Sequence, residues 1–122
     1  MKENYFEFSC RMKTNSVLSV IIPTLNEGKN LKVLIPFLLR CPGAERIEII
    51  VVDSPKSMDQ GYEICRSLNV SVYRCQETGR ARQMNFGAKK ARGHLFYFLH
   101  ADTRPPESFI MDIMKAFNKG YE

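Results

Sequence analysis

The stretch that decides the fold is Ile47-Glu48-Ile49-Ile50-Val51-Val52-Asp53. Apart from Glu48, the residues before Asp53 are apolar and β-branched, which is typical of a strand covered on both faces, as in a parallel sheet. Short runs of similar or aromatic character span residues 17–22, 70–73 and 95–99. We therefore predict about four buried strands.

The segments between these runs have the spacing of helices. Apolar side chains recur at steps of three and four over residues 29–39, 64–68, 81–91 and 109–117. The first segment is apolar almost all round, which predicts a well-buried helix. The third is expected to bury Ala81, Met84, Ala88 and Ala91. Because strands and helices alternate along the chain, we predict an α/β fold, a Rossmann-like and mostly parallel sheet with helices on both faces.

The chain has 122 residues, which suits one domain. We expect an N-terminal arm over residues 1–15, which have no clear period, and an α/β domain over residues 16–122. No apolar run approaches the roughly 20 residues of a membrane span, and charged residues interrupt the segment where a signal peptide would have its apolar core. Four cysteines stand far apart without a C-x-x-C pair, which favours reduced thiols. We therefore expect a cytoplasmic protein without a transmembrane segment.

Several functional classes lack their motifs in this chain. No G-x-G-x-x-G follows the first strand, and no G-x-x-x-x-G-K-[ST] or G-x-S-x-G occurs. This argues against a dinucleotide-dependent dehydrogenase, a P-loop NTPase and a serine hydrolase. The net charge of +5 is concentrated between Arg80 and Arg92. A solvated helix face, a phosphate-binding edge and a nucleic-acid patch all fit that count, but no nucleic-acid-binding module accompanies it, so we expect no nucleic-acid partner.

Polar side chains gather where the predicted strands end. Ligands of an open parallel sheet bind beyond the carboxyl ends of its strands. Asp53 ends the second strand and Asp102 follows the fourth, so both carboxylates are expected at one edge. Arg80 and Arg82 begin the third helix, where free N–H groups and the helix dipole favour anions. Each residue alone also suits a turn or a solvated surface, but together they indicate a diphosphate site.

Three motifs in order resemble family 2 glycosyltransferases of the GT-A fold. They are "SVIIPTLNEGKNL", "IEIIVVDSPKSMD" and "GRARQMNFGAKKARGHLFYFLHADTRPP", and the resemblance extends from about Ser16 to Phe117. Within the family, the chain is most similar to the selenoprotein-associated or radical-SAM-associated transferases. The resemblance implies the nucleotide-binding half of that fold, a truncated GT-A domain that binds a nucleoside-diphosphate sugar.

The resemblance also implies roles for individual residues. The turn expected to line the base and ribose consists of Pro23, Thr24, Leu25, Asn26 and Glu27. Asp53 is expected to hydrogen-bond the base, and Arg80 and Arg82 are expected to face the diphosphate. Asp102 matches the metal-binding end of a D-x-D motif for Mn²⁺ or Mg²⁺, and His100 stands at its first position. Such a cation would assist departure of the nucleoside diphosphate while an acceptor hydroxyl attacks the sugar.

The sequence departs from the family in three places. His100 replaces a carboxylate; its imidazole suits Mn²⁺ better than Mg²⁺. "DSPKSMD" replaces a glycine-containing loop, which leaves contacts with the base open. No Asp or Glu matches the family's catalytic base, which lies in an acceptor-binding half beyond this chain, so the catalytic residues are unknown.

These departures leave alternatives open. A complementing C-terminal half would supply the acceptor side, and a homo-oligomer is the other partner expected. A non-catalytic, self-associating module derived from a GT-A half is the main alternative, and a sugar-phosphate nucleotidyltransferase is less well supported because its Gly-rich loop is missing.

Overall fold

The computed structural model describes Glu7–Phe8 and residues 16–120, and within them one five-stranded sheet has the order β1-β4-β3-β2-β5. Its strands are β1 (Glu7–Phe8), β2 (Leu18–Thr24), β3 (Ile47–Asp53), β4 (Ser71–Arg74) and β5 (Leu95–Phe98). The strands β2 to β5 are parallel, which confirms the predicted sheet. The short strand β1 lies within the expected N-terminal arm and pairs antiparallel with β4; the rest of that arm lies outside the described residues.

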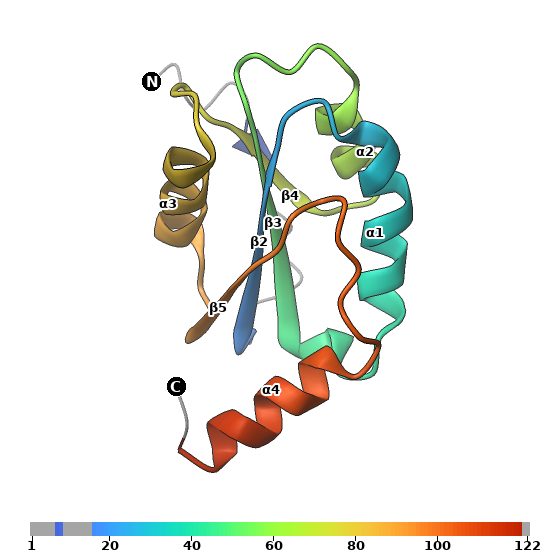
Figure 1. The fold of residues 1–122 in the computed structure, drawn as a ribbon, viewed down its shortest axis with the longest axis vertical. Coiled ribbons are helices and arrows are strands. Elements are labelled where there is room, and N and C mark those ends of the chain that lie inside the picture. The colour runs from blue at the N-terminus through green and yellow to red at the C-terminus, as the bar shows by residue number, and fades with distance from the viewer. Residues whose placement is uncertain (1–6, 9–15, 121–122) are drawn as a thin grey trace.

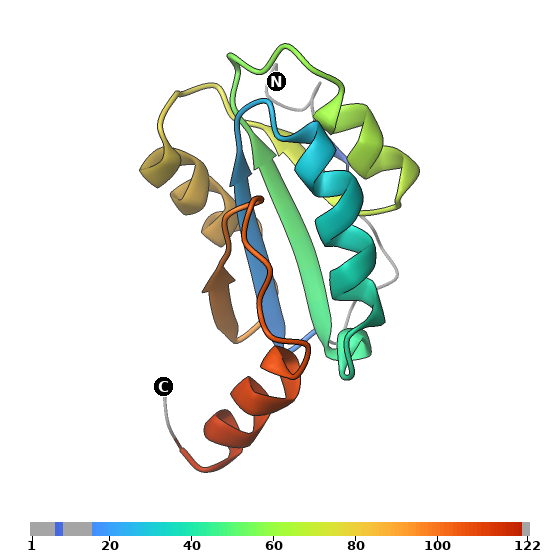
Figure 2. The ribbon, with the colours of Figure 1, turned by 45° about the vertical axis from the view of Figure 1, so that its right-hand side comes forward.

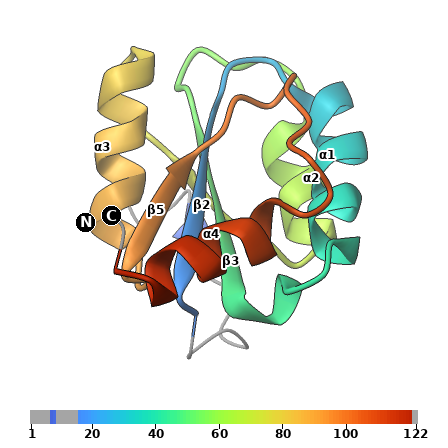
Figure 3. The same cartoon turned by 60° about the horizontal axis from the view of Figure 1, so that its bottom comes forward.

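Helices cover both faces of the sheet, as predicted (Figure 1). They are α1 (Gly28–Arg40), α2 (Gly61–Ser67), α3 (Arg80–Lys90) and α4 (Phe109–Asn118), with a short 3₁₀ helix, η2 (Ala44–Arg46), before β3. α1 and α2 lie on one face and α3 on the other (Figure 2). Viewed from below, α4 crosses the end of the sheet at which β2 and β3 begin (Figure 3). None of the described helices combines the length and apolar composition that a bilayer crossing requires.

The two faces of the sheet bury different side chains because successive residues of a strand point to opposite sides. On β3, Ile49 and Val51 join the larger core cluster with α1, α2 and α4. Ile50 and Val52 form a smaller cluster with Cys75, against which Phe86 of α3 packs. The predicted burial of the central strands is confirmed, since every residue of β2 and β3 is buried. β5 was also predicted to be buried, but Phe96 and Phe98 are exposed because this strand lies at the edge of the sheet.

The face by which α3 meets the sheet differs from our expectation. Gln83 and Gly87 are its buried residues, whereas Ala81 is exposed and Met84 and Ala88 are half-buried. A Cβ atom on Gly87 would lie 2.6 Å from Cγ2 of Ile21, so the helix backbone sits too close to the sheet for a side chain there. Apolar periodicity missed this contact because its two residues are an amide and a glycine.

The first helix is also less buried than its composition predicts. α1 buries one face, which includes Leu31, Ile35 and Leu38, while Val33 and Leu39 are exposed. Near-continuous apolar sequence therefore produced an amphipathic surface helix, because only one layer of strands lies beneath it.

A buried carboxylate fixes the connection between α3 and β5. Glu48 of β3 is 5% exposed and accepts hydrogen bonds from the Ser19 hydroxyl and from the backbone N–H groups of Arg92 and Gly93. The Arg92 side chain adds an ion pair at 3.8 Å. Glu48 therefore ties the end of α3 to β2 and β3 at the amino edge of the sheet.

Candidate nucleotide site at the carboxyl edge

Three neighbouring strands place one polar residue each in a row across the carboxyl edge. The register pairs Thr24 of β2 with Asp53 of β3, and Asp53 with Arg74 of β4. The Thr24 hydroxyl donates to Oδ1 of Asp53 at 2.8 Å, and Nη2 of Arg74 donates to Oδ2 at 3.3 Å. The Ser57 hydroxyl donates to Oδ1 as well, at 2.6 Å. The carboxylate is thus surrounded by donors from the protein itself.

This row lies on the α2 side of the sheet. The guanidinium of Arg74 stacks over the Tyr62 ring of α2 at 5.4 Å, whereas the preceding residue Val52 faces Gly87 of α3. Asp53 is 2% exposed. Sequence analysis placed Asp53 at the correct strand end; its predicted hydrogen bond to a base stays a prediction, and its hydrogen bonds in the structure are to other protein side chains.

The loop after β2 is joined to the loop after β3 by Asn26. Its backbone has a φ of 56°, a left-handed conformation that asparagine tolerates. Its side-chain oxygen accepts the N–H groups of Met58 and Asp59, at 2.7 and 3.2 Å, and its own N–H donates to Ser57. Asp59 in turn accepts the N–H of Gly28 at 2.8 Å, at the start of α1. Asn26, predicted as a base-lining residue, therefore holds two loops together.

A cavity of about 310 Å³ opens at the ends of β2 and β3, under the start of α3. Five of the predicted residues line it: Pro23, Thr24, Leu25, Glu27 and Arg80. The sequence analysis missed five others: Ser54, Lys56, Thr78, Gly79 and Gln83. In the sequence, Lys56 stood out only because it departs from the family's usual loop. Gln83 stood out only as part of the third motif.

The charges and dipoles around this cavity favour an anion. Lys56 and Arg80 bring two cations from different loops. The first N–H groups of α3 have no partner within a helix, and the helix dipole adds partial positive charge there. Gly79, at a φ of 112°, makes the turn that starts the helix at Arg80. The arrangement suits a diphosphate or a similar polyanion.

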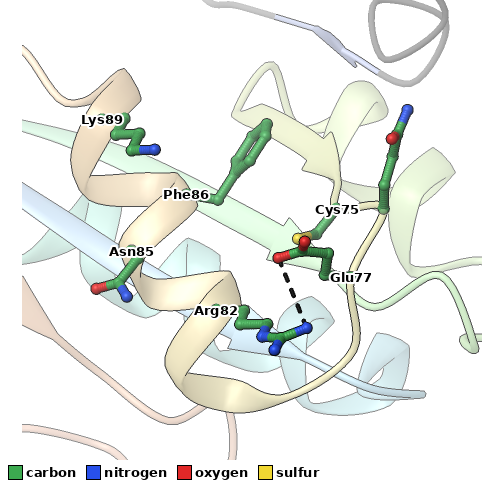
Figure 4. A pocket seen from close by; sticks show the side chains of 7 residues that line it. Cys75, Glu77, Arg82, Asn85, Phe86 and Lys89 are labelled. Atoms are coloured by element: carbon green, nitrogen blue, oxygen red, sulfur yellow. Dashed lines mark ion pairs between the residues drawn. The ribbon is translucent and has the colours of Figure 1, made fainter.

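The structure does not bring Arg82 together with Arg80. Arg82 lines a second cavity, of about 410 Å³, formed by α3 and the residues that follow β4. Figure 4 shows it pointing toward Glu77, with which it forms an exposed ion pair at 3.8 Å. Phe86 and Lys89 of α3 line the same cavity. The predicted contact of Arg82 with a diphosphate stays a prediction, and only Arg80 of the pair lines the first cavity.

The predicted metal ligands follow β5. Asp102 lines a third cavity, of about 400 Å³, with Asn30 and Leu34 of α1, and His100 is exposed nearby in sequence. The only described side chain bonded to the Asp102 carboxylate is Thr103, at 3.4 Å. Within the described residues, no three histidine, cysteine, aspartate or glutamate side chains gather as a metal-binding group. These residues therefore fit a divalent cation only if phosphate oxygens complete its shell, which is a common arrangement for Mg²⁺.

One hydrogen bond connects a residue that lines the cavity of Asp102 with a residue that lines the cavity of Lys56 and Arg80. Nδ2 of Asn30, which lines the third cavity, donates to Oε1 of Glu27, which lines the first, at 2.7 Å. A ligand that carries a diphosphate from Arg80 toward Asp102 would pass this pair.

Among the described cysteines, Cys65 has the largest resolved change of pKa. Burial in α2, and then the negative charge of Asp53, raise the pKa of its thiol to about 12. Cys41, Cys65 and Cys75 are free and buried, which agrees with the prediction of reduced thiols for these three.

Comparison with known proteins agrees with this geometry. The profile of the family described as "Glycosyl transferase family 2" matches residues 19–122. A dolichol-phosphate mannosyltransferase of Pyrococcus furiosus is 33% identical over 107 residues, which is 84% of this chain and 30% of that protein.

Solved structures show the same fold. TarS residues 1–349 of S. aureus, in complex with UDP-GlcNAc, have a TM-score of 0.73 at 25% identity, over 84% of this chain and 31% of that one. The mannosyltransferase PcManGT of Pyrobaculum calidifontis, in complex with GDP-Man and Mn²⁺, has a TM-score of 0.70 at 20% identity, over 88% of this chain and 33% of that one. The chain thus spans about a third of the length of the relatives it matches.

Proposed function

Because the chain belongs to glycosyl transferase family 2, we propose that its cationic cavity at the ends of β2 and β3 binds the nucleoside diphosphate of a sugar donor. The observation that carries the proposal is the convergence of Arg80, Lys56 and the start of α3 on one cavity. Two cations and a helix N-terminus stabilise the negative charge of a diphosphate, whereas a neutral sugar has no charge for them to stabilise.

In this proposal, each side of the cavity has a distinct task. Pro23, Thr24 and Leu25 border the base and ribose. Arg80 and Lys56 bind the phosphate oxygens, and Asp102 supplies one carboxylate to a divalent cation, Mn²⁺ or Mg²⁺, that the diphosphate also holds. Such a cation stabilises the negative charge of the leaving nucleoside diphosphate. His100 lies two residues before Asp102 and is exposed, so it is free to orient toward the same cation.

The full reaction that we propose is transfer of the sugar to an acceptor hydroxyl. The chain spans about a third of its relatives, so we expect a further segment or a second chain to provide the acceptor side and the catalytic base. The family match favours donor binding over the non-catalytic, self-associating alternative. The motifs "GRARQMN" and "LHADT" support the finer assignment to the selenoprotein-associated or radical-SAM-associated subgroup, and we place the activity in the cytoplasm.

Isothermal titration with UDP-, GDP- and dTDP-sugars, each with and without MnCl₂, tests the proposal. We expect one nucleotide class to bind, and to bind more tightly with Mn²⁺. Asp102→Ala should remove the gain from Mn²⁺ and leave the binding measured without metal. Glu45→Ala, which removes an exposed carboxylate from η2 at the opposite edge, is the matched control and should retain the gain. Absence of binding by every nucleotide sugar would contradict the proposal.

A further inference from the structure

The amide of Gln83 has a fixed orientation. Its Nε2 donates to the carbonyl oxygens of Thr24, at 2.9 Å, and of Val52, at 2.8 Å. Both partners are acceptors, so they can only face the NH₂ group of the amide. The alternative orientation of the amide would place Oε1 against two carbonyl oxygens, and the Thr24 oxygen would keep only its hydrogen bond from the N–H of Ser54. The side chain therefore directs its nitrogen toward the strand ends and its oxygen away from them.

That oxygen remains available as an acceptor. Gln83 is 4% exposed and lines the cationic cavity. No described residue donates a hydrogen bond to its Oε1, and this atom is not among the fully buried, unpaired polar atoms of the described residues, so it keeps some accessible surface. A largely buried carbonyl oxygen without a donor is unfavourable. A ligand that brings a donor to this point removes that cost.

The carboxylates at this edge already accept hydrogen bonds from the protein. Asp53, the acceptor expected to contact the base, lies on the α2 side and receives hydrogen bonds from Thr24, Ser57 and Arg74. Glu27 receives the Asn30 amide. The remaining charged residues of the cavity, Lys56 and Arg80, are donors. Gln83 thus offers the cavity a buried, neutral acceptor in a fixed position.

We infer that Oε1 of Gln83 accepts a hydrogen bond from the nucleoside part of the donor, and so helps to select the nucleotide. The inference rests on the proposed nucleotide-binding function. The ligand group is an N–H of the base edge or a hydroxyl of the ribose, since both are donors and phosphates at neutral pH are not. Gln83 has a second effect, because the same amide positions the start of α3, and with it Arg80, over the strand ends.

A cycle of protein and ligand changes tests this inference. The probes are UDP, GDP and dTDP, each also with the base N–H methylated (N3 of uracil or thymine, N1 of guanine) and with the 3′-hydroxyl or, where present, the 2′-hydroxyl removed. The protein variant is Gln83→Lys, whose ammonium still donates to both carbonyls but accepts nothing. Gln76→Lys adds the same charge at the exposed entrance of the neighbouring cavity and is the matched control.

For the nucleotide that binds, wild type should lose about five- to tenfold in affinity when the contacted group is removed from the ligand. Gln83→Lys should bind the parent nucleotide more weakly by a similar factor. Removal of the contacted group from the ligand should then cause no further loss of affinity in this variant. Gln76→Lys should behave as wild type throughout. The ligand group whose removal lowers the affinity of wild type, either the base N–H or a ribose hydroxyl, is the donor to Gln83.

A measurement on unmodified protein covers the case in which Gln83→Lys does not fold. The side-chain amide resonances of Gln83, recorded by NMR, should shift on addition of the parent nucleotide and not with the analogue that lacks the contacted group. If wild type binds a nucleotide but no analogue shows coupling to Gln83 and its amide resonances stay in place, the inference is overturned while the proposed function stands. If wild type binds none of the probes, the proposed function itself fails.

Discussion

Thr24 and Asp53 end neighbouring strands in register, and the threonine hydroxyl donates to the buried carboxylate at 2.8 Å. This pair ties the two strands whose ends form the floor of the cavity. It also explains why Asp53 tolerates burial, since a buried carboxylate needs donors at both oxygens. The row that continues to Arg74 is therefore a structural feature of the carboxyl edge in this structure.

Thr24→Val should lower the free energy of unfolding by about 1–3 kcal/mol, because it removes a donor from a buried charge without changing the side-chain volume much. Urea unfolding of the purified chain measures this. Thr24→Ser retains the hydroxyl and should cost clearly less. A loss for valine that is no larger than the loss for serine would contradict a dominant contribution from this hydrogen bond.

Gly87→Ala should destabilise the protein by about 1–3 kcal/mol, because the new Cβ would lie 2.6 Å from Cγ2 of Ile21 and 3.1 Å from Cγ2 of Val52. Helix propensity alone predicts the opposite sign, a gain of about 1 kcal/mol for alanine over glycine. The sign of the change in thermal unfolding thus separates the two effects. Val52→Ala removes one of the two close methyl groups. The double variant Gly87→Ala/Val52→Ala should therefore lose less unfolding free energy than the sum of the losses of the two single variants.

Arg80→Ala should weaken nucleotide binding by about tenfold or more, as expected for loss of a charge-assisted hydrogen bond to phosphate. Arg82→Ala is the matched control: it removes the same charge two residues away, from a side chain that lines the other cavity. Calorimetric titration with UDP and GDP compares them. A larger loss for Arg82 than for Arg80 would place the diphosphate in the second cavity.

Cys65 should resist alkylation by iodoacetamide in the folded protein at pH 8, because its pKa is raised to about 12 by burial and by Asp53. Since the folded pKa lies above the ordinary value of 9.0, its contribution to stability is complete below pH 9 and decreases between pH 9 and 12. The Cys65→Ala variant should show a shallower fall in unfolding free energy over that window. Mass spectrometry after labelling, with urea-unfolded protein as the reference, locates the modified thiols.

The sheet could be predicted from the sequence because its signal is local. The strand Ile47–Asp53, for example, is apolar up to Asp53 except at Glu48, and the alternation of such runs with helices implies parallel pairing. The face of α3 could not be predicted in the same way, since Gln83 and Gly87 contact the sheet through an amide and through the absence of a side chain. The strand β1 is two residues long and has no period to detect.

The candidate site was predictable at the level of strand ends and less so at the level of contacts. Pro23, Thr24 and Arg80 were expected at the cavity and line it. The separation of Arg82 from Arg80 depends on the rotation of α3 about its own axis. Because the apolar pattern predicted the wrong buried face for that helix, this separation could not be predicted. The partners of Asp53 depend on register between strands that are distant in sequence.

The attachment of α3 has a consequence for its dynamics. Its first turn is held by the Gln83 amide at the carboxyl edge, and the residues just after its last turn are held by the Glu48 carboxylate at the amino edge. A helix anchored at both ends cannot fray from either one without breaking a buried polar contact. We therefore expect the amides of α3 and of the following turn to exchange with solvent together, in a single opening event that also dismantles the entrance to the cavity.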